Sequence, residues 1–155
     1  MADYTIEQIE DAIIKAADAL KDADLLGVRT VKSYQGELEQ EDIQRLVALF
    51  PAVYVVYGGS VYTDHGSRKV EKMTYHLFVC DKNLRSEEEA RRGGTGNPGT
   101  YAMLDAVRDL LFAKQLSLEI FPLKLNRQTP VWFGNGISIY AAEYETGQAL
   151  LYSAT

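Results

Sequence analysis

One glycine-rich run in the sequence has a spacing typical of phosphate binding. Residues 94–99 read Gly-Thr-Gly-Asn-Pro-Gly and match the pattern G-x-G-x-x-G. In dinucleotide-binding proteins the first glycine directly follows a buried strand, so that backbone amides at the next helix meet the pyrophosphate. Here a charged run, 87–93, precedes it, and Glu119 does not follow a second parallel strand. We therefore expect a loop, with a nucleotide-binding enzyme that uses this loop as an alternative hypothesis.

The histidines, the cysteine and two glutamates are the other candidates for chemistry. His65 and His76 are the only histidines and Cys80 is the only cysteine. On a strand, residues 76 and 80 share a face but lie about 13 Å apart, too far to share a zinc ion. Glu143 and Glu145 also share a strand face, where they form an acid–base pair, a solvated face or a subunit contact. We predict no catalytic residue, no cofactor-binding residue and no metal site.

Composition narrows the class of protein further. The chain has 155 residues, of which 46% are apolar, and a net charge of −6. That length suits one domain with its own core. The acidic balance argues against a basic face that binds nucleic acid, and a single cysteine excludes an intramolecular disulfide framework. The acidic start, 1–7, and the lack of an apolar run of about 20 residues lead us to expect a soluble cytoplasmic product without an export signal.

Hydrophobic spacing predicts alternating helices and strands. Apolar residues at steps of three and four indicate helices, β-branched runs indicate strands, and Asn135-Gly136 is typical of a tight hairpin. Thr5 with Gln8 predicts a capping box, and Thr100 is expected to cap a later helix. Segment 58–70 is interpreted as a loop or a hairpin arm, and 149–152 as an edge strand or a frayed end. The predicted helices are 6–23, 40–49 and 101–115, and the predicted strands are 28–34, 52–57, 73–81, 123–132 and 137–145.

This order of elements predicts an α+β fold. We expect a mixed, mostly antiparallel sheet with three helices packed mainly on one face, in a single domain over 1–155. Segment 82–99 is charged and then glycine-rich, so we expect a long flexible loop there. Ten tyrosines, many on predicted strands, fit either a half-exposed sheet in a monomer or a sheet face that binds protein.

Several segments together resemble a known family. They are the proline-led aromatic strand 49–59, the Arg/Glu-rich segment 83–93, the tyrosine-led helix 99–111 and the end of the chain, 122–146. Their order and spacing are similar to those of the Mu-like phage tail family labelled gp37, and the resemblance runs from Thr5 to Thr146.

The resemblance implies a tail terminator, or tail-completion protein, of contractile-tailed phages, with the fold of that class and no catalytic residue. Such a protein caps the head-proximal end of the tail tube as a homo-oligomer, a hexameric ring. It stops polymerisation of tube and sheath proteins and offers a surface to the head–tail connector. The implied location is the virion tail, after assembly in the host cytoplasm. From the acidic balance we also expect a ring that lets DNA pass without sequence-specific binding, and we expect no membrane partner.

We expect the charged part of segment 82–99 to supply assembly contacts. Opposite charges side by side are able to pair across a subunit boundary and fix its register. A monomeric head–tail adaptor is the other non-enzymatic interpretation. The residues expected to make these contacts are Arg85, Glu87, Glu88, Glu89, Arg91 and Arg92.

Overall fold

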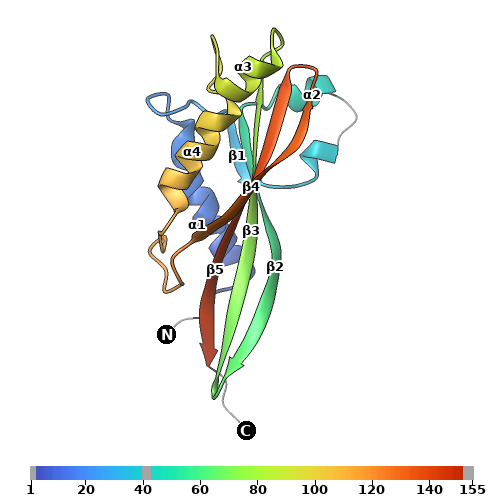
Figure 1. Ribbon diagram of the computed structural model, residues 1–155. Coiled ribbons are helices and arrows are strands. Elements are labelled where there is room, and N and C mark those ends of the chain that lie inside the picture. The colour runs from blue at the N-terminus through green and yellow to red at the C-terminus, as the bar shows by residue number, and fades with distance from the viewer. Residues whose placement is uncertain (1–2, 40–42, 152–155) are drawn as a thin grey trace.

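A five-stranded sheet organises the computed structural model, which describes residues 3–39 and 43–151 (Figure 1). Its strand order is β1-β2-β3-β5-β4, with β1 parallel to β2 and every other pair antiparallel. The predicted α+β class with a mixed, mostly antiparallel sheet is confirmed. The strands are β1 (Thr30–Ser33), β2 (Ala52–His65), β3 (Arg68–Lys82), β4 (Lys124–Gly134) and β5 (Ile137–Leu151).

Two main helices, α1 (Ile6–Ala17) and α4 (Thr100–Leu111), cover one face of the sheet (Figure 1). Thr5 and Gln8 form the predicted capping box at the start of α1. The apolar stripes of both helices are buried against alternate residues of β2 and β3, because successive strand residues point to opposite faces. Representative buried residues of this main core are Ile9, Ile13, Val53, Leu77, Val107 and Leu111.

A smaller apolar cluster lies on the opposite face, beside the short helix α2 (Ile43–Val47). Leu46 and Phe50 pack there with Tyr54 and Cys80, which point away from the main core. Cys80 is therefore a buried core residue, as its apolar neighbours predict. The predicted helix 40–49 is shorter in the structure, and residues 40–42 lie outside the described residues. None of the helices that the structure describes is long and apolar enough to cross a membrane.

Segment 58–70 is a hairpin arm. β2 and β3 continue through it to a turn at 66–67, and the distal half of β5 completes a three-stranded arm that extends away from the helices (Figure 1). The buried Glu71 carboxylate accepts hydrogen bonds from Ser60 Oγ, Tyr62 Oη and Gln148 Nε2 at 3.0, 2.7 and 3.0 Å. Residues 149–151 extend β5, whereas Tyr152 lies outside the described residues.

Helix boundaries differ from the predictions at three places. The helix expected over 6–23 ends at Ala17 and continues as a 3₁₀ turn, η1 (Asp18–Lys21). Gly99, not Thr100, is the N-cap of α4; Thr100 lies inside the helix, where its Oγ1 is 2.8 Å from Ser138 Oγ. α4 ends at Leu111 and not at 115, because Phe112 is extended and Ala113 has a φ of 63°.

Replacing Leu77 by Ala tests how much the main core contributes to stability. Leu77 is fully buried on the helix-covered face of β3, so Leu77→Ala should lower the free energy of unfolding by about 2–5 kcal/mol, measured by urea denaturation. Val61→Ala on the exposed arm is the matched control and should change it by no more than about 0.5 kcal/mol. Equal losses in the two variants would contradict this account of the core.

Candidate functional site

The charged residues of segment 82–99 lie at the end of the sheet opposite the arm. Part of the segment is a helix, α3 (Glu87–Arg92), capped by the Ser86 side chain, so the expectation of a loop throughout is wrong. Within α3, Arg92 Nη1 lies 3.2 Å from Glu88 Oε1. The Arg91 guanidinium lies 5.5 Å from the centre of the Phe133 ring. Arg85 and Glu87 are exposed beside them, while Glu89 is half-buried.

The glycine-rich run is built around a buried carboxylate of the same chain. Asp81, at the end of β3, accepts hydrogen bonds from Gly99 N at 2.6 Å, Asn97 Nδ2 at 2.9 Å and Lys82 N at 2.8 Å. The Gly99 amide lies at the start of α4, where a dinucleotide-binding fold would hold its phosphate. Asp81 therefore occupies the anion position that the fingerprint would require.

Close backbone packing explains why Gly99, the last residue of the glycine-rich run, and Gly93, the residue just before the run, are both glycine. A Cβ on Gly99 would lie 2.3 Å from the backbone nitrogen of Gly93, and a Cβ on Gly93 would lie 2.5 Å from the carbonyl oxygen of Pro98. Both residues also have a positive φ, near 90°, that favours glycine. These two glycines thus allow residues 93–99 to fold tightly beside the end of β3.

The electrostatic balance at Asp81 is set by burial against hydrogen bonding. Burial raises the pKa of this carboxyl above its ordinary value, and the hydrogen bonds from Asn97, Lys82 and Gly99 oppose the rise. Because the rise prevails, the ionised carboxylate is less favourable in the folded chain than in water. Through its hydrogen bonds with Asn97 and Gly99, Asp81 joins β3 to the glycine-rich run and to the start of α4.

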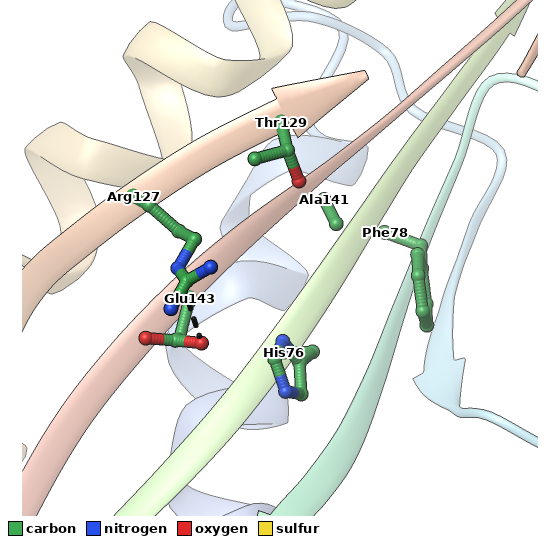
Figure 2. Close-up of a pocket in the computed structure, with 6 residues that line it drawn as sticks. All are labelled: His76, Phe78, Arg127, Thr129, Ala141 and Glu143. Atoms are coloured by element: carbon green, nitrogen blue, oxygen red, sulfur yellow. Dashed lines mark ion pairs between the residues drawn. The ribbon is translucent and has the colours of Figure 1, made fainter. Parts of the chain in front are cut away.

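The sheet face away from α1 and α4 carries a row of polar side chains (Figure 2). His76, Glu143 and Arg127 are opposite one another on β3, β5 and β4, and Arg127 Nε lies 3.6 Å from Glu143 Oε1. Beside them, a shallow hollow of about 300 Å³ lies over the small side chain of Ala141, between Phe78 and Thr129. This face is thus able to receive a protruding side chain and to hydrogen-bond to it.

The other residues that the sequence suggested for chemistry do not come together in one site. Glu143 and Glu145 share this face as predicted, and Asn126 Nδ2 lies 3.3 and 3.4 Å from their carboxylate oxygens. Cys80 is covered by the α2 cluster and His65 lies at the tip of the arm, far along β2. Within residues 3–39 and 43–151, no group of three or more His, Cys, Asp or Glu side chains is arranged to hold a metal ion.

An exposed apolar stretch on β4 is a feature that the sequence patterns did not predict as functional. β4 is an edge strand, and Val131, Trp132 and Phe133 near its end are exposed. A sequence signal exists, since the chain's single tryptophan lies in a strand close to a proline, a residue that favours sheet edges. Together with α3, this stretch makes the end of the sheet both charged and apolar.

Comparison with known proteins identifies the family and the fold of this chain. The chain belongs to the bacteriophage Mu Gp37 family, whose model matches residues 5–149. A chain from the virion of a native gene transfer agent particle has the same fold, with a TM-score of 0.57 and 14% sequence identity. The match covers 96% of this chain and 100% of that chain. No curated protein matches the sequence.

Replacing Asp81 by Asn tests the buried carboxylate through the pH dependence of stability. Because the pKa of the Asp81 carboxyl is raised in the folded chain, its protonation stabilises the fold at pH values below the ordinary pKa of an aspartate, near 4. This stabilisation is lost as the pH rises through the pKa that Asp81 has in the folded chain. Asp81→Asn does not titrate. Relative to the wild type, its free energy of unfolding should therefore increase between pH 4 and pH 7, by about 1.4 kcal/mol for every tenfold difference in proton affinity between the folded and unfolded chains.

The absolute stability of the Asp81 variants provides the second readout. Asp81→Ala leaves the Gly99 and Lys82 amides without this acceptor, and should cost about 1–3 kcal/mol in urea denaturation. The free energy of unfolding of Asp81→Ala, taken relative to that of the wild type, should increase between pH 4 and pH 7 as it does for Asp81→Asn. If the free energy of unfolding of the variants instead falls further below that of the wild type as the pH rises, the surroundings of Asp81 stabilise its ionised form, and this account is wrong.

Proposed function

We propose that this chain is a structural virion protein that caps the head-proximal end of a phage tail tube as an oligomeric ring. In that role it ends polymerisation of tube and sheath and offers a surface to the head connector. The observation that carries the proposal is membership of the Gp37 family over residues 5–149. The fold shared with a gene transfer agent virion chain supports it.

The distribution of surfaces suits a ring subunit placed between two other structures. A closed ring with heterologous contacts needs different surfaces on its two sides, and a cap needs different ends. The three-stranded arm forms one end of this molecule, and α3 with the β4–β5 hairpin forms the other (Figure 1). A ring number of six is part of the proposal, as is the passage of DNA past a protein whose net charge is −6.

We place assembly contacts on α3 and the residue before its cap. Arg85 and Glu87 are exposed, and the pair Glu88–Arg92 is more than 60% exposed at both side chains, so exchange for partners on a neighbouring subunit costs little. Arg91, stacked on Phe133, and Glu89, next to the glycine-rich run, join this surface to the sheet. All six residues predicted from the sequence therefore lie on or beside one short helix.

Electron microscopy of phage particles tests the proposed function. Deletion of the gene should give tails of abnormal length that are not joined to heads, and wild-type protein supplied in trans should restore them. An Arg85→Glu variant should restore them poorly, because it reverses an exposed charge at the proposed contact. Lys15→Glu on α1 is the matched charge reversal and should restore normal tails. Normal tails after deletion would reject the function.

Limited proteolysis tests the proposed mobility of segment 82–99 before assembly. Only one apolar side chain of α3, Ala90, is buried, so the helix depends on polar contacts and should open readily. We expect the first tryptic cut in the free protein between Arg85 and Arg92, and faster cutting in Asp81→Ala, which loses the hydrogen bond to Gly99. Early cutting elsewhere would count against a mobile segment.

A further inference from the structure

The outer half of β2 is an open edge of the three-stranded arm. β1 pairs with β2 only over Ala52–Val55, and no other described strand lies on that side of β2. Beyond the bulge at Tyr57–Gly59, β2 pairs with β3 in regular register as far as His65. The stretch 59–65 therefore has a strand on one side only.

The backbone ladder shows which residues of this edge point outward. Tyr34 N donates a hydrogen bond to Val55 O, so the odd-numbered residues of inner β2 direct their backbone groups toward β1. The bulge adds one residue to β2 and reverses this alternation. Beyond the bulge, the N–H and C=O groups of Ser60, Tyr62 and Asp64 therefore point away from β3, to the open side.

β5 forms a second open edge, on the other side of the arm (Figure 1). β4 pairs with β5 only as far as Glu145, and Gly147 O accepts a hydrogen bond from Phe121 N. No described strand lies beside 148–151 on this side, where the alternation leaves the N–H and C=O groups of Ala149 pointing outward. β2 and β5 both run toward the tip of the arm, with β3 between them.

Neither edge of the arm carries the features that discourage strand addition. Natural sheets protect an exposed edge with charges, proline or bulges. Residues 59–65 hold no proline, lysine or arginine and a single carboxylate, Asp64, which lies 3.2 Å from Lys69. Residues 146–151 hold neither proline nor a charged side chain. β4, at the far edge of the sheet, has proline, cations and irregular register.

The side chains along the two edges are also able to pack together. Tyr62 and Leu150 lie on one face of the arm, and Val61 and Ala149 lie on the other, as their pairing with β3 shows. Val61 is 64% exposed and Tyr62 is 51% exposed. A strand added beside β2 would cover this apolar surface on both faces.

We propose that β5 of one copy of this chain pairs in parallel with β2 of a second copy, along the open stretch 59–65. The added strand takes the line that β1 leaves at Ser33, and β1 is itself parallel to β2. Copies related by rotation about an axis along the arm all point the same way and present β5 to β2 in this parallel sense. The inference rests on the proposed ring and names its subunit contact.

Closure of the ring favours a second copy over a strand of another protein. A foreign strand added to β2 leaves the β5 edge of the same arm open, and one added to β5 leaves β2 open. Two copies joined β2 to β2 leave both β5 edges open. In a ring of β5-to-β2 contacts every copy has both edges paired, so no open edge of the arm remains, as in a closed barrel.

Cross-linking between engineered cysteines tests the contact. Val61→Cys and Ala149→Cys place thiols on the same face of the two edges, and the native Cys80 is buried. With a short bismaleimide, a mixture of the two single variants should give a covalent dimer, and the double variant should give a ladder of larger products. Neither single variant alone should dimerise. Dimers of Val61→Cys alone would indicate β2-to-β2 pairing and overturn the inference.

Proline on the open edge tests the backbone hydrogen bonds. Tyr62→Pro and Tyr62→Ala both lose the phenol, but only the first lacks the outward N–H. That N–H does not pair with β3, so the proline variant should stay folded, which circular dichroism checks. Tyr62→Pro should weaken association, measured by analytical ultracentrifugation or by the yield of the cross-link, at least about tenfold more than Tyr62→Ala. Equal weakening in the two variants overturns the inference.

The outcomes separate this contact from the proposed function. The cross-link is sought both in concentrated full-length protein and in tails restored by the cysteine variants. If deletion of the gene disturbs tails but no cross-link forms in either sample, the contact is wrong and the function stands. If the cross-link forms in the concentrated protein but deletion leaves tails normal, the contact stands and the tail function fails.

Discussion

The backbone ladder of β3 is the constraint on which the rest of the structure depends. β3 pairs with β5 along its whole length and with β2 over nearly all of it, and these three strands alone form the arm. Because strand side chains alternate, the same ladder fixes which residues of β3 enter the main core and which enter the α2 cluster. A shift by one residue would exchange Val79 with Cys80 and disrupt both clusters.

Asp81 connects that ladder to the part of the molecule with the least apolar support. The chain leaves β3 one residue later, after Lys82, and forms α3 with little burial. It returns to the Asp81 carboxylate through Asn97 and Gly99 before α4 begins. A few strong polar contacts thus hold a segment that lacks a core of its own. Such a segment keeps a defined position and a low local stability at the same time, which suits a surface that reorganises during assembly.

Local signals in the sequence predict the elements that depend on neighbouring residues. The capping box at Thr5 and the Asn135-Gly136 turn are of this kind, and both are present. The sequence does not decide between a loop and an arm at 58–70, because the polar, glycine-containing strands there are stabilised by pairing with residues 149–151 of β5, far along the chain. α3 has no apolar stripe, although Ser86 followed by Glu89 is a recognisable cap signal. The hydrogen bond from Gly99 to Asp81 joins residues far apart in the sequence, so no local sequence pattern predicts it.

The edge strand β4 shows why side chains, and not backbone pairing, are suited to carry contacts there. An open edge invites strand addition, and natural sheets restrict it with bulges, prolines and charges. β4 has irregular register at Leu125–Arg127 and at Pro130–Trp132, and it carries Lys124 and Arg127. These features leave a short regular run for another strand, while the second irregularity lies directly beside Trp132. The edge is thus protected against indiscriminate pairing at the place where it presents its largest apolar side chain.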